Sequence, residues 1–455
     1  MISHPTCRSR LGVLMARAVL VLPFMAAGSL PARAQSSEPT LQRPYRGVFA
    51  PVGTEGRRFD LLWSLAGVYD DNVSTDMAGY DPRLLLGGAY GQGAATVNFS
   101  LKGRTTTFGA TGRTNLRYYP DLSDLNAVDG SGGVSLTSDL TRTLKLSLSQ
   151  NLSYIPYYQF GFLNGVAPSQ VTEPDRIPAT GSSTMQTVGS VSADGRVSLT
   201  RSIGRRSSLG ADYSYRYSTI ETSPDPFLWQ LANVRFTKPF TRYASLKLGY
   251  GYGRTSNGVV IVPVNPDTPP VALPVSSEVE TQNIDVGVAY TKPLSQSRRT
   301  YVTVSPGTSV VKYLGDRQLV VLVNAGLTHN FKASWNANLA YDRGVQFVEG
   351  IAGPLYADTV QMRVGGLLAR AIEMAVSGSY SSGQIGVAAQ DPGYDTYGGF
   401  ATIRFAFSRT LSLEAQYRYS RYVFDERAPL LPGLPRAMEQ QGFRIGVTGW
   451  LPFLR

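Results

Sequence analysis

The sequence predicts an all-β fold, a single transmembrane β-barrel of antiparallel strands. Three observations predict it: two-residue alternation recurs along the chain after residue 58, charged residues are only 16% of the composition, and no run of about 18 apolar residues follows Ala34. Soluble domains carry about 25% charged residues. In lipid, only helices and closed barrels provide a hydrogen-bond partner for every backbone N–H and C=O group. A secreted soluble β protein is the alternative.

The first 34 residues have the pattern of a secretory signal. Three arginines precede an apolar run at 18–27, and Ala32-Arg33-Ala34 is a small-x-small cleavage site. The apolar run is shorter than the about 20 residues that a membrane-spanning helix needs. We therefore expect export and cleavage near Ala34. The single cysteine, Cys7, would leave with the signal, so no disulfide or thiol chemistry is expected.

The region after the signal divides into an arm and a barrel. Residues 35–58 are rich in Pro, Gly and charge and lack a period, which predicts an irregular periplasmic arm or a small plug. Residues 59–455 are expected to form the barrel, with about 18 strands and 16 as the alternative, because bacterial barrels have even counts. The strands are predicted at 59–69, 83–101, 105–119, 130–139, 143–155, 184–200, 206–219, 228–238, 242–254, 280–291, 299–313, 317–330, 334–345, 357–369, 372–382, 394–408, 410–421 and 440–453.

The last strand shows the pattern most usefully. In Gly442 to Phe453 one face carries Phe443, Ile445 and Val447, while Arg444 lies on the other face. A strand that is apolar on one face and polar on the other suits a wall with lipid outside and water inside. We therefore expect the three apolar residues to point toward lipid.

The connections alternate between two kinds. Short turns such as Lys102-Gly103-Arg104 hold basic residues, whereas long irregular segments such as 156–183 and 422–439 hold most of the acidic ones. Bacterial barrels have short periplasmic turns and long extracellular loops. Tyrosines near the strand ends suit the membrane interface. Both termini of the barrel are therefore expected on the periplasmic side.

A short motif resembles a known family. Val68-Tyr-Asp-Asp-Asn-Val73 ends the opening strand just after the secreted arm, and hairpins follow it to the C-terminus. This arrangement resembles the β-barrel porin 2 family of outer-membrane proteins over about residues 55–455, most specifically at Tyr69 to Val73. The resemblance implies a pore, sometimes encoded with exopolysaccharide export genes, and it brings no catalytic residues.

Catalytic, metal and nucleic-acid functions find little support. The only histidine after the signal is His329, beside a predicted periplasmic turn, and a serine or cysteine nucleophile would need a better-placed base. Asp70-Asp71-Asn72 lacks the spacing of a twelve-residue calcium loop. The net charge of +11 is spread singly, without a basic module. We predict no enzyme, no metal, no cofactor and no nucleic-acid partner.

The predicted lumen face carries more arginine than carboxylate. Such a wall would focus positive potential and favour anions, unless the arginines pair with nearby acids and stiffen the wall. Aromatic residues of the long segment 156–183 are candidates for a constriction. The pore-lining candidates are Arg113, Arg117, Arg216, Arg363, Arg404, Arg418 and Arg444, and the constriction candidates are Tyr157, Tyr158, Phe160 and Phe162.

These patterns predict a porin in the outer membrane of a Gram-negative bacterium that passes polar, chiefly anionic, solutes. An export conduit for exopolysaccharide, working with export partners, is the alternative within transport. A structural or adhesive barrel is the alternative of another class. Outer-membrane lipid, lipopolysaccharide and the barrel-assembly machinery are the expected partners.

Overall fold

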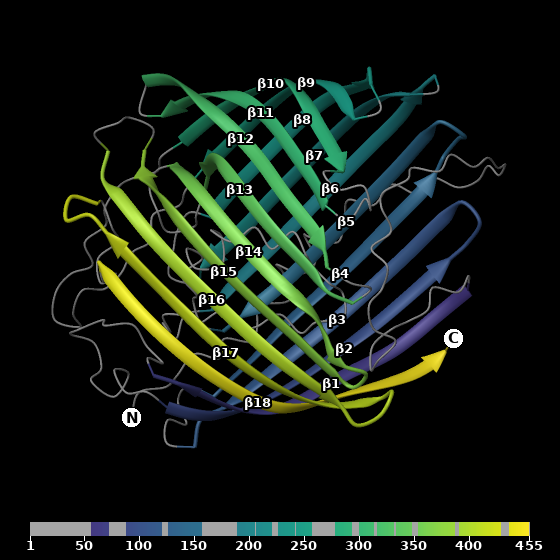
Figure 1. Ribbon diagram of the computed structural model, residues 1–455, viewed down its shortest axis with the longest axis vertical. Coiled ribbons are helices and arrows are strands. Elements are labelled where there is room, and N and C mark those ends of the chain that lie inside the picture. The colour runs from purple at the N-terminus through teal and green to yellow at the C-terminus, as the bar shows by residue number, and fades with distance from the viewer. Residues whose placement is uncertain are drawn as a thin grey trace, which may run out of the picture.

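The protein forms a closed barrel of 18 antiparallel strands, seen in a computed structural model (Figure 1). The predicted barrel and its strand count are confirmed. The structure describes residues 56–71, 88–120, 126–156, 189–204, 206–220, 226–241, 243–256, 278–293, 300–313, 316–331, 334–347, 354–386, 391–428 and 436–454. The strands are β1 Gly56–Asp70, β2 Gly88–Lys102, β3 Thr106–Tyr118, β4 Ala127–Asp139, β5 Leu144–Ile155, β6 Ser190–Ile203, β7 Ser207–Ile220, β8 Phe227–Pro239, β9 Ala244–Ser256, β10 Glu278–Pro293, β11 Thr300–Tyr313, β12 Asp316–Asn330, β13 Asn336–Gln346, β14 Leu355–Ala369, β15 Ile372–Ile385, β16 Gly393–Ala406, β17 Leu411–Phe424 and β18 Ala437–Leu454.

The opening strand starts earlier than predicted. β1 begins at Gly56, so the last three residues of the predicted arm belong to the barrel wall, while 35–55 lie outside the described residues. Pairing with β2 accounts for the extension, because residues 56–58 stand opposite residues 100–102 in the ladder. Arg58 also forms an ion pair with the fully buried Asp60 two residues along the same strand. The described part of the chain contains no helix long and apolar enough to cross a membrane.

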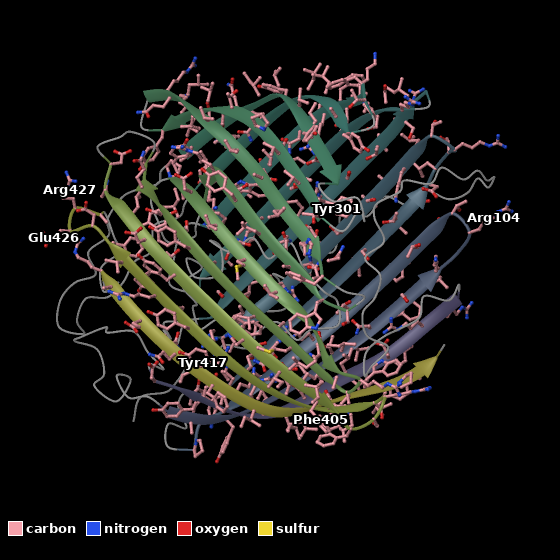
Figure 2. All side chains as sticks on the ribbon, in the orientation of Figure 1. Arg104, Tyr301, Phe405, Tyr417, Glu426 and Arg427 are labelled. Atoms are coloured by element: carbon pink, nitrogen blue, oxygen red, sulfur yellow. The ribbon has the colours of Figure 1, made fainter. Side chains whose placement is uncertain are left out.

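Alternation sorts the side chains between two faces of the wall. In β1, Leu65 is 63% exposed whereas its neighbour Ser64 is 1% exposed. In β18, Phe443 and Ile445 are exposed on the outer face, as predicted, and Thr448 is buried on the inner one. Such an outer surface is costly in water and favourable in lipid, which is the arrangement of a transmembrane barrel. Figure 2 shows Phe405 and Tyr417 on this outer face.

The barrel closes by pairing its first and last strands. β1 and β18 pair in register from Asp60 with Pro452 to Asp70 with Gly442. Beyond the ladder, the Asp71 amide donates to the Gln441 carbonyl at 3.0 Å, and the Gln441 amide donates to the Asp71 carboxylate at 2.6 Å. Closure leaves no free strand edge, which in lipid would expose unpaired peptide groups.

One polar side chain on the outer face is covered by a tyrosine. The Tyr215 hydroxyl donates to Gln150 Oε1 at 2.6 Å, and Gly195 lies between them on β6. A Cβ at Gly195 would lie 2.2 Å from the Tyr215 ring, so glycine is what lets the ring reach across the strand.

Removing the Tyr215 hydroxyl is expected to lower stability modestly. Tyr215→Phe leaves the Gln150 amide oxygen without its donor in an apolar surrounding, at a cost of about 1–2 kcal/mol. Urea titration of the folded barrel in detergent micelles measures the change. Tyr213→Phe, on the same strand and outer face, is the control and should change the stability by less than about 0.5 kcal/mol. Equal losses in both variants would contradict the role of this hydrogen bond.

One stretch of the wall departs from regular pairing. The register between β10 and β11 shifts between Ile284 and Tyr290, opposite Pro306. Proline has no amide hydrogen and cannot complete the ladder, so it tends to occur at bulges. A Cβ at Gly287 would lie 2.6 Å from the Pro306 carbonyl oxygen, which shows how closely the two backbones approach there.

Candidate pore site

A row of alternating charges lines the inner wall where the barrel closes. Glu373, Arg404 and Glu414 occupy directly opposed positions on β15, β16 and β17. The Arg404 guanidinium lies 3.5 Å from Glu373 and 3.0 Å from Glu414, and its Nε also donates to Glu414 at 3.3 Å. The side chains are 11–20% exposed, so the charges are largely removed from water and depend on one another.

Arg444 carries this row across the closing strand. Its Nη1 lies 3.5 Å from Glu414, its Nε donates to Gln92 at 3.2 Å, and its Nη2 lies 3.4 Å from the Ser64 hydroxyl. It therefore links β17, β18, β1 and β2. Beyond it, Gln92 donates to Asn115 at 2.9 Å and Asn115 donates to Asp129 at 2.8 Å, reaching β4. We call Glu373, Arg404, Glu414, Arg444, Gln92, Asn115 and Asp129 the polar ladder.

A second ion pair crosses the same closure nearer the long-loop end. Arg418 Nη2 lies 3.1 Å from Asp70 Oδ1, and the Tyr90 hydroxyl donates to Asp70 Oδ2 at 3.1 Å. Gly442 separates Asp70 from Arg418 in the register, and a Cβ there would lie 2.2 Å from the Asp70 carboxylate. The absence of a side chain at Gly442 therefore leaves room for the ion pair between Asp70 of β1 and Arg418 of β17, which passes across β18.

The remaining arginine candidates are distributed around the wall. Arg216 Nε lies 3.6 Å from Asp194 and belongs to the opposite side of the barrel. Arg113, Arg117 and Arg363 fall on inner register positions and have interactions of their own. Four of the candidates are paired with acids, as the alternative in the sequence analysis expects: Arg216, Arg404, Arg418 and Arg444. The inner wall therefore presents charges of both signs. The candidates Tyr157, Tyr158, Phe160 and Phe162 lie outside the described residues.

The wall opposite the polar ladder is built around glycines. β9 lies nine strands from β18 around a ring of 18, and its inner positions include Gly249, Gly251 and Gly253. Cβ atoms at Gly251 and Gly253 would lie 2.1 Å from Asn233 and 2.4 Å from Thr281. Side chains of β8 and β10 therefore lie over the bare backbone of β9, and the inner surface there is shaped by its neighbours.

The end of β13 leaves the wall and turns inward. β13 pairs with β12 only from Asn336 to Arg343, but its pairing with β14 continues to Gln346. Residues 345–347 line a pocket together with residues of β7, β8 and β10, which are several strands away around the ring. Only a strand end that projects into the lumen can make these contacts.

An apolar cluster fixes this inward end. Val279 and Val311 are fully buried and Val320 is 5% exposed, and all three point inward from β10, β11 and β12. Val345 and Phe347 pack against them. An apolar inner cluster is unusual in a water-filled barrel, and burying it stabilises the inward position by roughly 1.5–3 kcal/mol for each large side chain.

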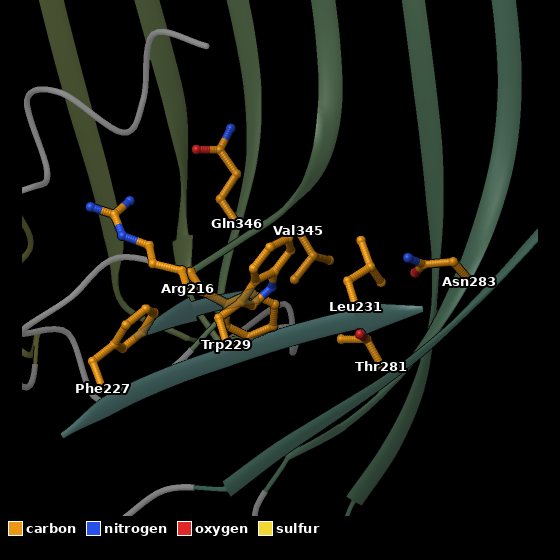
Figure 3. A pocket seen from close by; sticks show the side chains of 9 residues that line it. Arg216, Phe227, Trp229, Leu231, Thr281, Asn283, Val345 and Gln346 are labelled. Atoms are coloured by element: carbon orange, nitrogen blue, oxygen red, sulfur yellow. The ribbon is translucent and has the colours of Figure 1, made fainter. Parts of the chain in front are cut away.

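The pocket between the β13 end and the wall has a mixed lining (Figure 3). Its volume is about 210 Å³. Its lining combines the aromatic rings of Phe227 and Trp229, the Arg216 guanidinium and polar groups that include Asn283 and Gln346. Gln346 Oε1 is buried and has no hydrogen-bond partner among the described residues. We call this the β13 pocket.

Sequence reasoning identified Arg216 but missed the rest of this pocket. Trp229 and Asn283 follow ordinary strand alternation, and Gln346 to Phe347 looked like the start of a loop. The one available signal was Trp229 itself, a large aromatic residue at an inner position of β8.

The histidine considered as a catalytic base, His329, lies at the end of β12. His329 Nδ1 lies 2.6 Å from the Thr300 hydroxyl, and its ring packs edge-on against Phe331. A hydrogen-bonded imidazole beside an aromatic ring at a turn needs no catalytic explanation. Within the described ranges, no three His, Cys, Asp or Glu side chains are grouped to hold a metal ion.

Comparison with known proteins returns outer-membrane barrels of low similarity. The chain matches no protein-family model and no curated protein. Among solved structures, it is similar to OccK2 of Pseudomonas aeruginosa (8% identity, covering 88% of this chain and 98% of that one, TM-score 0.44). OccAB3 of Acinetobacter baumannii (9%, 87% and 99%, 0.45) and the ferric-catecholate import receptor Fiu of E. coli K12 (9%, 88% and 82%, 0.45) are comparable. These values assign neither a family nor a solute.

Proposed function

We propose that this protein is an outer-membrane porin that passes small polar solutes by diffusion. The observation that carries the proposal is the closed 18-strand wall, with exposed apolar residues outside and charged, amide and hydroxyl groups inside. A barrel of this size has an interior that side chains of the wall alone do not fill. The resemblance of Val68 to Val73 to the β-barrel porin 2 family agrees with this function, and membership in that family is part of the proposal.

The solute preference we propose is for anions, but a weak one. Arg404 and Arg444 face Glu373 and Glu414, so these four formal charges cancel. The arginine candidates outside these pairs, such as Arg113 and Arg363, also fall on inner register positions. A pore of this kind admits both ions and favours the anion modestly.

Planar bilayer recordings test this function. The purified protein is expected to give stable stepwise increases of current in potassium chloride. In a gradient of potassium chloride, the sign of the reversal potential is expected to be that of a pore more permeable to chloride than to potassium. Arg444→Gln removes one positive charge and should move the reversal potential toward cations, whereas Glu414→Gln should move it toward anions. The absence of conductance would contradict the porin. Shifts of the same sign in both variants would contradict the placement of these charges in the ion path.

A further inference from the structure

The β13 pocket has the chemistry of a ligand site within the lumen. Its lining supplies three aromatic rings, one guanidinium, one hydroxyl and two carboxamides from β7, β8, β10 and the end of β13 with the residue after it. The polar ladder lies on the other side of the ring and contributes none of these groups. A pocket with a few convergent polar groups on an apolar lining is the usual form of a small-molecule site.

Arg216 is the anion-binding element of the pocket. It stands opposite Trp229 in the register between β7 and β8, and its side chain is 52% exposed. Its Nε faces Asp194 at 3.6 Å, which is too long for a strong hydrogen bond. The planar guanidinium therefore retains donors for a carboxylate, which it can bind through two parallel hydrogen bonds.

Gln346 offers an acceptor to a ligand that donates hydrogen bonds. Its Oε1 is a buried acceptor without a partner among the described residues, and such an atom costs about 1–3 kcal/mol when left unpaired. A carboxylate cannot satisfy it, since an ionised carboxylate only accepts. A hydroxyl can. Thr281 and Asn283, on the β10 side, add further groups able to bond hydroxyls.

Trp229 and Phe227 supply the third requirement, which is an apolar ring face. Phe227 is 6% exposed, and Trp229 lies beside Val345 of the inward strand end (Figure 3). Aromatic rings pack well against flat molecules that have C–H groups on their faces and polar groups at their edges. The volume of about 210 Å³ is large enough for several waters or one small ring.

We propose that the β13 pocket binds a sugar acid, a single pyranose ring that carries one carboxylate. The carboxylate would pair with Arg216, ring hydroxyls would donate to Gln346, and a ring face would lie against Trp229. The proposal deepens the porin function, on which its role in selecting solutes rests. Pocket occupancy would slow ions at the inward end of β13 and would appear as interruptions of the open current.

The proposal is tested by measuring how galacturonate interrupts the current through single channels in a planar bilayer. Galacturonate is expected to interrupt the current at lower concentration than galactose, which lacks the charge, or succinate, which lacks hydroxyls and a ring. Arg216→Gln and Trp229→Ala should each raise the half-blocking concentration of galacturonate about tenfold. Arg196→Gln is the control, because Arg196 pairs with Asp212 at 3.8 Å on the same wall but outside the pocket, and it should change the value less than about twofold.

The outcomes separate the pocket from the pore. Open current without galacturonate block, or equal block by all three compounds, would overturn the pocket and leave the porin. Calorimetric binding of galacturonate to the detergent-solubilised barrel, weakened by Arg216→Gln, would support the pocket even if no current were seen. If neither conductance nor calorimetric binding of galacturonate were seen, both the porin function and the ligand pocket would be overturned. Heat-modifiable mobility on a gel confirms that each variant is folded, and Arg216→Lys, which keeps the charge but loses the planar fork, should fall between wild type and Arg216→Gln.

Discussion

Replacing Glu414 with alanine is expected to lower the free energy of unfolding by about 3 kcal/mol or more. Glu414 is 9% exposed and is the one acid that contacts both Arg404 and Arg444, at 3.0 Å and 3.5 Å. Its loss leaves Arg444 with only the neutral groups of Gln92 and Ser64 among its described contacts. Breaking a buried ion pair by removing one partner typically costs 3–5 kcal/mol, because the remaining charge is uncompensated.

Urea unfolding in detergent micelles measures the effect of Glu414→Ala. The control is Glu278→Ala, since Glu278 pairs with Arg254 at 2.6 Å while both side chains are about half exposed. An exposed pair contributes less than about 1 kcal/mol, so this variant should be close to wild type. If both variants lost the same stability, the polar ladder would be no more than a set of solvated lumen charges. Arg444→Met combined with Glu414→Ala should recover part of the loss, because both partners of the Arg444 pair are then removed and Arg404 keeps Glu373 as its acid.

The barrel could be predicted from sequence because alternation is a local signal. Thr448 and Phe443 of β18 face opposite sides because one is an even and the other an odd position of the same strand. As long as no bulge interrupts a strand, all its even positions point to one face and all its odd positions to the other. Alternation therefore places Phe443 and Ile445 on one face and Arg444 on the other, and the first two are exposed on the outer face. The strand count followed from the spacing of turns in the same way.

The pairing of charges could not be predicted in this way. Arg444 contacts Ser64 and Gln92, which are 380 and 352 residues away in the chain, and it reaches them only because β1 and β18 meet. The alternation of residues shows on which face of the wall a charge lies. It does not show which strands become neighbours when the barrel closes, such as β18 and β2 on either side of β1. For that reason the sequence left the pairing of these arginines with acids as an open alternative and could not identify Glu373, Glu414 and Asp70 as the partners.

The inward turn of β13 has a different cause. The strand follows the same alternation as its neighbours, and its departure from β12 after Arg343 depends on an apolar cluster contributed by three other strands. Val279, Val311 and Val320 are ordinary strand residues taken singly. Their common inward direction creates a dry surface inside the barrel that can be covered only by part of the chain itself, and Val345 and Phe347 cover it.

Replacing Gly446 with valine is expected to prevent or severely weaken closure of the barrel. Gly446 pairs with Ala66 across β1 and β18, and a Cβ at this position would lie 2.6 Å from the Ala66 Cβ and 2.7 Å from the Leu65 carbonyl oxygen. Opposed Cβ atoms in a sheet normally stand about 4.5–5.5 Å apart, so the two strands approach too closely for any side chain. Overpacking costs about 1–3 kcal/mol even where the surroundings can yield, and here the obstacle includes backbone.

The clash at Gly446 acts on the pairing that brings Arg444 to Ser64 and Gln92, so its effect should exceed that of the steric contact alone. Heat-modifiable mobility after refolding into detergent measures the folded fraction, which should fall steeply for Gly446→Val and less for Gly446→Ala. Gly67→Ala is the matched control, because Gly67 lies in the same pair of strands and a Cβ there meets no atom within 4 Å. A Gly446→Val barrel that refolds as completely as Gly67→Ala would show that β1 and β18 can separate at this point without opening the wall, and the close approach would then have no part in holding the ends of the chain together.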